Sequence, residues 1–295
     1  MISVAEAFET FRQRLELTET ESDDAQRRHS SVRECIRSRF QIDRDFLTGS
    51  YARHTKTKPL KDVDIFFILS EKEKQWHGKK PNEMLAAFED CLVKSYGRDQ
   101  VEQGRRCVTV EFPKIYQTQD PDGKILSIDA VPAFDVGGHY EIPDRPLGKW
   151  IPSDPEIHKE EATAKNKQLD GKWVPLVKMI KRWNREAGKP IKPMFLLEVM
   201  AQELLDPPFN NYPDEIQRFF SAAQSEIEQD WPDPAGLGPL VSDQMDPTKR
   251  ETAKKAFRDA ERLAVQAMRA EQRGHVGEAL ELWRQIFGAR YFPTS

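Results

Sequence analysis

Apolar residues along the chain follow two kinds of spacing, and the change from one to the other divides the sequence in two. Helical spacing marks residues 3–16, about 22–40 and 81–96. Strand patterns mark residues 45–47, 64–69, 107–112 and 125–134. Beyond about residue 155 only helical patterns remain, over residues 173–187, 193–205, 214–227, 247–273 and 277–287. This order predicts an α+β fold, in which a mixed sheet with flanking helices precedes a helical bundle.

The same change of pattern predicts the domain organisation. The chain has 295 residues, enough for two lobes, because single domains usually hold about 100 to 200 residues. We place residues 1–155, which include the N-terminal helices, in a first domain, and residues 156–295 in a second, helical domain.

Composition narrows the class of protein. The sequence is 32% charged and has no apolar run of about 20 residues, the length that a membrane helix needs. The stretch MISVAEAFETF lacks the order of a signal peptide, so we expect a cytoplasmic protein. A net charge of -4 argues against a protein that coats nucleic acid. Cys35, Cys91 and Cys107 form no metal-binding or disulfide pattern, and we interpret them as reduced thiols.

Two acidic residues stand at the start of an apolar strand, within LTGSYARHTKTKPLKDVDIFFIL. Asp62 and Asp64 are two residues apart, so on a strand both side chains point to the same side. Asp129 interrupts a second apolar strand, where an unpaired charge is costly. If the two strands pair, the three carboxylates converge, and such a cluster suits Mg²⁺. Two ions can then activate an attacking hydroxyl and neutralise a leaving pyrophosphate.

Residues upstream of the acidic pair suggest a phosphate site. Gly49 lets the backbone approach a phosphate closely, and the amides and hydroxyl at Ser50 can donate to its oxygens. On the helix predicted at 173–187, Lys178 and Lys181 lie one turn apart on one face. Both are candidates for contacts to the outer phosphates.

Taken together, these motifs resemble a known family. GSYARHTKTKPLKDVDIF resembles the signature of polymerase-β-type nucleotidyltransferases, and more narrowly of the bacterial cGAS/DncV-like nucleotidyltransferases. SIDAVPAF is similar to the strand that carries the third carboxylate of that family, and LVKMIKRWN to its basic helix. The segment 148–155 with His158, and LWRQIFGARYF near the C-terminus, are also similar to family motifs. The resemblance spans most of the chain.

The resemblance implies an activity and roles for individual residues. Asp62, Asp64 and Asp129 would be catalytic and bind two Mg²⁺ ions, with Mn²⁺ as a substitute, and Asp129 would lie closest to the acceptor hydroxyl. Gly49 and Ser50 would hold the donor triphosphate, and Lys181 and Lys178 its outer phosphates. The helical domain would close over the active-site cleft.

The implied reaction joins NTPs into a cyclic di- or trinucleotide with release of pyrophosphate. The implied substrates are ATP first and GTP second. The product would be a second messenger in anti-phage (CBASS) defence, read by a separate effector. A partner or an RNA could switch the enzyme on, and we expect a monomer.

Two other functions fit the same motifs. One keeps the chemistry but changes the acceptor, to RNA, to protein or to linear oligoadenylate. The missing basic tract argues against this function. The other is a catalytically silent adaptor that only binds nucleotides, which the presence of all three aspartates argues against.

Several residues keep alternative interpretations. Trp183 and Trp283 lie on apolar helical faces, which favours core positions over base stacking. Tyr51 can stack on a base or anchor a turn, and the charged run 71–80 around Trp76 is predicted to be a solvated loop. The chain also departs from relatives that place a Lys-Ser pair before the helix at 193–205, because it has Lys192-Pro193 there. A serine contact to the substrate is therefore in doubt.

Overall fold

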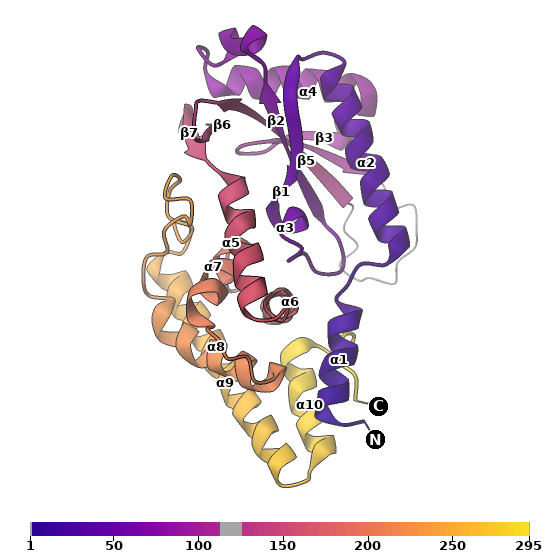
Figure 1. Ribbon diagram of the computed structural model, residues 1–295, viewed down its shortest axis with the longest axis vertical. Helices are drawn as coiled ribbons and strands as arrows, with labels where there is room; N and C mark the ends of the chain where they lie inside the picture. Colours follow the sequence, from indigo (N-terminus) through magenta and orange to yellow (C-terminus); the bar gives the residue numbers. More distant parts are fainter. Residues whose placement is uncertain (1, 113–125, 295) are drawn as a thin grey trace. The chain divides into compact units, whose positions relative to one another are not determined.

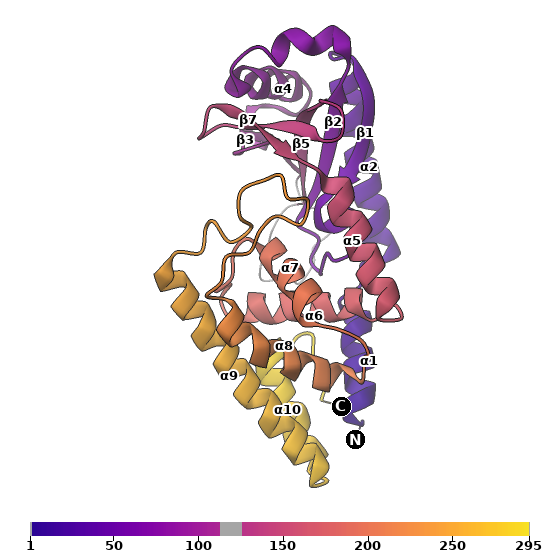
Figure 2. The same cartoon turned by 60° about the vertical axis from the view of Figure 1, so that its left-hand side comes forward.

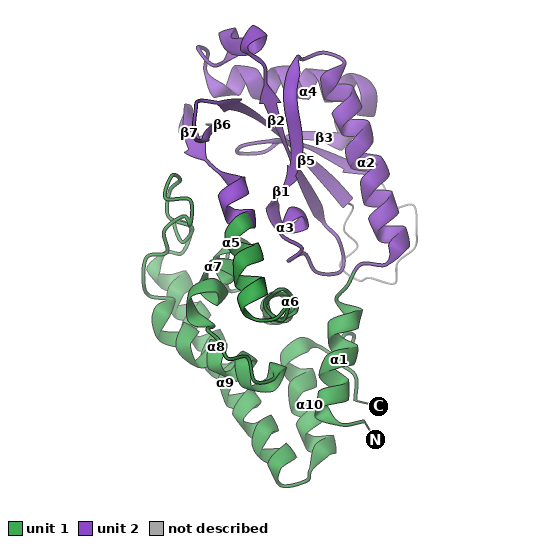
Figure 3. Cartoon of the chain, viewed as in Figure 1, with its two compact units in different colours: residues 1–16, 160–295 green, residues 17–159 purple. Residues whose placement is uncertain are grey.

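The computed structural model describes residues 2–112 and 126–294. It divides the chain into two compact units, drawn in two colours in Figure 3. Unit 1 consists of residues 1–16 and 160–295, and unit 2 of residues 17–159. The polypeptide therefore begins in unit 1, forms all of unit 2, and returns to unit 1.

A seven-stranded sheet forms the centre of unit 2. Its strands are β1 (Ile42–Thr48), β2 (Asp62–Leu69), β3 (Val101–Gln103), β4 (Val108–Phe112), β5 (Leu126–Asp135), β6 (Tyr140–Asp144) and β7 (Lys149–Ser153). The strand order is β1-β2-β5-β4-β3, and β6 pairs with both β5 and β7. Strands β2 and β5 run parallel, while the other described pairs are antiparallel. The sheet is therefore mixed, as predicted.

Helices cover one face of this sheet (Figure 1). They are α2 (Glu19–Arg37) and α4 (Pro81–Tyr96), while the single-turn helix α3 (Gly49–Ala52) follows β1. Short 3-10 helices occupy Glu71–Trp76 and Arg98–Gln100. Ile65 and Phe67 of β2 pack with α2 and α4, whereas Phe66 and Ile68 pack with Tyr140 on the other face. Because both faces of β2 are buried, its sequence is apolar at every position from Ile65 onward.

Unit 1 is built from helices (Figure 2). Their buried residues form one large apolar core. Its helices are α1 (Val4–Arg14), α6 (Trp173–Glu186), α7 (Met194–Leu204), α8 (Tyr212–Glu226), α9 (Pro247–Gln272) and α10 (Val276–Phe287). Helix α5 (Pro155–Gln168) begins in unit 2 and ends in unit 1. Within the described part of the chain, no helix combines the length and apolar character needed to cross a membrane.

The predicted elements are confirmed, with differences at their edges. Ile125, the first residue of one predicted strand, lies outside the described residues. Helix α2 begins earlier than predicted, because Thr18 accepts from the Glu21 amide while the Glu21 carboxylate accepts from the Thr18 amide, a capping box. The periodicity did not reveal β3, β6, β7, α3 or α5. Residues 71–76 form a 3-10 helix rather than the predicted loop.

The first helix does not belong with the sheet. The predicted first domain included both N-terminal helices, but α1 falls in unit 1. The Phe8 ring centroid lies 5.0 Å from that of Trp283 in α10 and 5.2 Å from that of Phe292. Phe11 is also fully buried in this core. We grouped α1 with the sheet because it comes before the sheet in the sequence. Helical periodicity shows that one face of a helix is apolar, but not which partner covers that face.

The position of α1 yields a prediction about stability. Phe8→Ala should lower the free energy of unfolding of unit 1 by about 3–5 kcal/mol, the usual cost of deleting a buried phenyl ring. Urea unfolding followed by circular dichroism measures this loss. Gln13→Ala, on the exposed side of the same helix, should stay within about 0.5 kcal/mol of wild type. Equal effects of the two substitutions would show that α1 is not part of the unit 1 core.

Candidate active site on the central strands

The register of β2 and β5 brings two of the predicted carboxylates together. Asp64 is the direct cross-strand partner of Asp129 in the parallel pair. Asp62 is partnered by Ser127, one pair earlier along the same two strands. Asp62 is exposed, whereas Asp64 and Asp129 are partly buried. The three acidic residues therefore lie on adjacent strands, and Asp64 and Asp129 are less exposed than Asp62.

Burial and mutual repulsion raise the pKa of both paired carboxyls. The pKa of Asp64 rises to about 8, mainly because burial disfavours the charged form, and then because Asp129 and Asp62 are negative. The nearby positive charge of Arg53 acts in the opposite direction. The pKa of Asp129 rises to about 6, also mainly through burial, while a hydrogen bond from Thr109 holds it down. The protein therefore does not fully compensate a negative charge at either carboxyl, and each holds a proton more readily when no cation is present.

Gly49 lies directly against the Asp64 carboxylate. Thr48, the last residue of β1, is the cross-strand partner of Asp64, so the chain turns into α3 beside this side chain. Gly49 has a φ of 63°, and a Cβ atom added to it would lie 1.9 Å from Oδ2 of Asp64. Both the left-handed conformation and the missing space require glycine here.

Ser50 lies in the turn that leads away from Gly49. Its carbonyl oxygen accepts hydrogen bonds from the amides of Thr55 and Lys56, at 3.0 and 3.1 Å. These bonds fold residues 50–56 back on themselves. The Gly49-Ser50 backbone thus lies next to Asp64. Its contact with a phosphate stays a prediction.

The donor set fits a divalent metal ion with oxygen ligands. Among the residues that the structure describes, no three Asp, Glu, His or Cys side chains form a complete metal-binding cluster. Mg²⁺ usually binds through one or two carboxylates, with substrate phosphates and water as its other ligands. Asp64 and Asp129 face each other and would supply two such carboxylates. A bound cation would lower their raised pKa values, because it favours the charged form. The roles of Asp62, Asp64 and Asp129 as metal ligands stay predictions.

The two predicted phosphate-binding lysines belong to unit 1, not to the unit with the carboxylates. Lys178 Nζ lies 2.7 and 2.8 Å from the carboxylate oxygens of Glu16. Lys181 Nζ lies 2.6 Å from Oε1 of Glu198, and the two side chains are only 4% and 3% exposed. Both lysines therefore have an ion pair inside unit 1. Their contacts to a triphosphate stay predictions.

Other candidate residues have structural positions. Trp183 and Trp283 are buried in the unit 1 core, as their apolar helical faces predicted, and the Trp183 ring stacks on Phe257. Tyr51 is partly buried against the core of unit 2, and Lys56 Nζ lies 3.7 Å from its ring centroid. Trp76 also packs partly against that core.

The sequence motifs did not single out two residues that face the carboxylates. Arg53 belongs to the GSYAR motif, is buried, and lowers the pKa of Asp64. Thr109 hydrogen-bonds Asp129 from the neighbouring strand. A polar residue between Val108 and Val110 was the available signal for Thr109, but its target depended on the register of β4 against β5.

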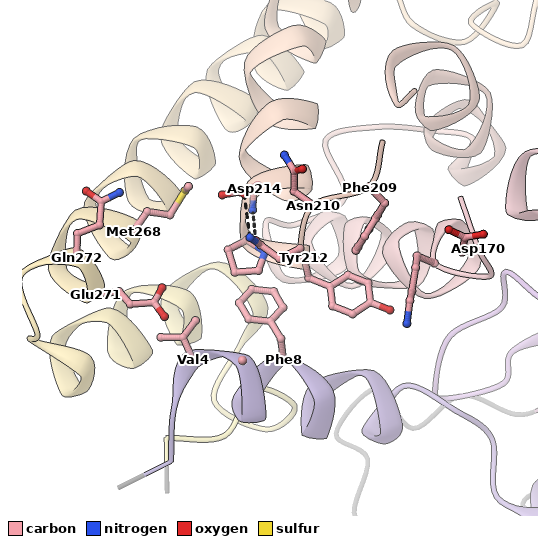
Figure 4. Close-up of a pocket in the computed structure, with 14 residues that line it drawn as sticks. Val4, Phe8, Asp170, Phe209, Asn210, Tyr212, Asp214, Met268, Glu271 and Gln272 are labelled. Atoms are coloured by element: carbon pink, nitrogen blue, oxygen red, sulfur yellow. Dashed lines mark hydrogen bonds between the residues drawn. The ribbon is translucent and has the colours of Figure 1, made fainter. Parts of the chain in front are cut away.

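A separate pocket of about 630 Å³ lies in unit 1 (Figure 4). Phe8, Phe209, Tyr212 and Met268 give it an apolar side, and polar residues such as Asp214 complete it. It contains none of the residues that the sequence motifs predicted for the site. The pocket is therefore not part of the carboxylate site.

Comparison with known proteins identifies the family. Residues 2–166 match the Second Messenger Oligonucleotide or Dinucleotide Synthetase (SMODS) domain, which covers all of unit 2 and its carboxylates. The chain belongs to the SMODS family. The predicted membership of the cGAS/DncV-like nucleotidyltransferases is confirmed, and with it the prediction of an enzyme of the cyclic oligonucleotide synthase class.

Named relatives agree with the SMODS assignment. A cyclic AMP-AMP-AMP synthase of Acinetobacter sp. (strain ATCC 27244 / 9458) is 27% identical, over 95% of this chain and 83% of the relative. A probable cyclic nucleotide synthase of Bacillus cereus (strain VD146) is also 27% identical, over 83% of this chain and 81% of the relative. The structure of Escherichia coli MS115-1 CdnC with ATP has a TM-score of 0.76 at 19% identity, over 99% of both chains. At that identity the likeness concerns the fold.

Gly49 gives the first prediction for this SMODS site. Gly148 has a similar φ of 60°, but a Cβ atom there would meet nothing within 4 Å. Gly148→Ala should therefore lose only about 1–2 kcal/mol, the cost of a left-handed non-glycine residue. Gly49→Ala should lose more, because the Asp64 carboxylate must also move. Urea unfolding compares the two variants, and equal losses would mean that Asp64 does not rest against Gly49.

Asp64 gives a second prediction, about pH. Its folded-state pKa of about 8 lies above the usual 3.8, so the folded protein holds the proton more tightly than the unfolded chain does. The resulting stability is complete below about pH 4 and is lost as pH rises through about 8. In metal-free buffer, we expect the Tm of wild type to fall more than that of Asp64→Asn between about pH 5 and pH 8.5.

A carboxylate outside the site provides the control for this pH series. Asp99 is exposed, so Asp99→Asn should follow the wild-type curve. The measurement is thermal unfolding by circular dichroism at each pH. Parallel curves for wild type and Asp64→Asn would contradict the raised pKa.

Proposed function

We propose that this chain is a Mg²⁺-dependent nucleotidyltransferase that joins NTPs into a cyclic di- or trinucleotide and releases pyrophosphate. The observation that carries the proposal is the Asp64–Asp129 pair, which faces across β2 and β5 with Gly49 against it. This arrangement suits a triphosphate whose charge must be balanced while a hydroxyl attacks it. Membership of the SMODS family supports the same chemistry.

Each residue of the site has a role in this proposal. Asp62, Asp64 and Asp129 would hold the metal ions, which when bound polarise the phosphate and neutralise the charge of the leaving pyrophosphate. Asp129 would lie closest to the acceptor hydroxyl. The backbone at Gly49 and Ser50 would bind the donor triphosphate, because glycine leaves room for a phosphate oxygen to approach the main chain.

The helical unit would supply further contacts. Lys181, and less directly Lys178, would reach the outer phosphates, with unit 1 closing over the nucleotide. Such a contact requires Lys181 to exchange or share its partner Glu198, since both side chains are buried in an ion pair. A lysine that stays paired throughout would instead have only a structural role.

The names of the relatives indicate which substrates to test first. Two are cyclic AMP-AMP-AMP synthases and one is a cyclic UMP-AMP synthase, so ATP alone is the first substrate to supply, followed by mixtures with the other NTPs. The product would act as a second messenger in anti-phage defence, read by a separate effector. A neighbouring structure, E. coli MS115-1 CdnC, forms a complex with a HORMA protein, which makes a protein partner a candidate activator.

Product analysis tests the proposed function. Purified protein is incubated with radiolabelled ATP and Mg²⁺, then with all four NTPs, and the products are treated with alkaline phosphatase. We expect a phosphatase-resistant nucleotide whose mass identifies its ring size and bases. Adding RNA to a parallel sample distinguishes extension of RNA from cyclisation. Absence of both pyrophosphate and resistant product, with and without candidate activators, would refute the proposal.

Charge-removing substitutions test the metal-binding role. Asp62→Asn and Asp64→Asn keep the side-chain shape and remove the negative charge, so pyrophosphate release should fall by at least roughly 10²–10³-fold. Circular dichroism should show that both variants remain folded. The exposed residue Asp99 again provides the control, because Asp99→Asn should retain wild-type activity. Undiminished turnover in a folded Asp64→Asn variant would remove Asp64 from the metal site.

A further inference from the structure

The third carboxylate is held by a residue on the neighbouring strand. Thr109 of β4 and Asp129 of β5 are direct partners in the antiparallel pair. The Thr109 hydroxyl donates a hydrogen bond to Oδ1 of Asp129 at 2.6 Å, a short distance typical of a bond to a charged carboxylate. The contact therefore occupies one of the two carboxylate oxygens from the protein side.

A second polar group lies just before β4. Cys107 precedes the first residue of the strand and is partly buried on the sheet face opposite to Val108 and Val110. The Cys107 sulfur is 3.8 Å from Oγ1 of Thr109. Cys107 is thus a neighbour of Thr109, and the Thr109 hydroxyl is the group that contacts Asp129.

We propose that Thr109 is a positioning residue for metal binding, which holds Asp129 through Oδ1 and leaves Oδ2 for the cation. This inference rests on the proposed function. The terminal torsion of an aspartate is soft, so a carboxylate facing another carboxylate would turn away unless a donor held it. Thr109 is that donor for Asp129, on the side opposite to β2, because β5 lies between β2 and β4.

The size of the expected effect follows from similar sites. Hydrogen-bond partners of metal ligands, when substituted, typically cost 10–100-fold in metal affinity or activity. A threonine with a purely structural role in β4 would instead contribute through its methyl group and its preference for strands. The two roles depend on different atoms of the same side chain, and two substitutions separate them.

Thr109→Val keeps the shape of the side chain and removes the hydroxyl, whereas Thr109→Ser keeps the hydroxyl and removes the methyl. The test is Mn²⁺ binding to the full chain, followed by electron paramagnetic resonance. An ATP analogue with a methylene between the α and β phosphates prevents turnover during the measurement. We expect Thr109→Val to weaken Mn²⁺ binding about tenfold or more. Thr109→Ser should bind Mn²⁺ close to wild type.

A buried threonine elsewhere in unit 2 provides the matched control. Thr57 is 2% exposed, and its hydroxyl has no hydrogen-bond partner among the residues described, so Thr57→Val should leave Mn²⁺ binding unchanged. Tm values accompany each titration. If Thr109→Val does not fold, Thr109→Ala provides the comparison with Thr109→Ser.

Three results would overturn the inference. Wild-type Mn²⁺ affinity in folded Thr109→Val is the first. An equal loss in the Val and Ser variants is the second, because the loss would then not follow the hydroxyl group. The third is a wild-type protein that does not bind Mn²⁺. Pyrophosphate release by wild type is measured separately: if it occurs while Thr109→Val binds normally, the inference fails and the proposed function stands.

Discussion

Parallel pairing between β2 and β5 is the constraint on which the site depends. Both strands are buried on two faces, and a shift by one residue would turn every side chain to the wrong side. The register is therefore fixed by large apolar residues such as Ile65 and Phe67, each worth about 1.5–3 kcal/mol when buried. That same register places Asp64 opposite Asp129. Hydrophobic packing thus holds together two carboxylates that would otherwise separate.

Ion pairs inside unit 1 add a cost to the proposed contacts between its lysines and a triphosphate. Lys181 and Glu198 join α6 to α7 in a nearly dry environment, and removing one partner from such a pair leaves an uncompensated buried charge. A triphosphate that attracts Lys181 must therefore offset the loss to Glu198, whereas Lys178 pairs with the more exposed Glu16 at smaller cost. Lys178 is therefore the more easily released cation, although the family resemblance favours Lys181.

Sequence patterns predicted the elements better than their partners. The mixed sheet and the helical second half followed from periodicity. The acidic motifs also predicted that Asp64 and Asp129 would meet if their strands paired, and the register of β2 and β5 makes them direct partners. Periodicity could not assign α1 to unit 1, because an apolar face is compatible with any apolar partner. The motifs did not reveal the effects of Arg53 and Thr109 on the two carboxyls for a related reason. Those effects depend on which residues lie close together in the folded chain. Short strands such as β3 carry too few residues to show alternation.

The protein compensates the charge of the Asp64–Asp129 pair only in part. Thr109 donates to Asp129 and Arg53 acts on Asp64, yet both carboxyls keep a raised pKa. A fully satisfied pair would be more stable without metal, but it would also gain less when a cation arrives. Sites that need strain or repulsion for function commonly give up stability in this way. Thr109 and Arg53 therefore compensate Asp129 and Asp64 only in part, and this leaves both carboxyls able to gain from a cation, as their proposed metal-binding role requires.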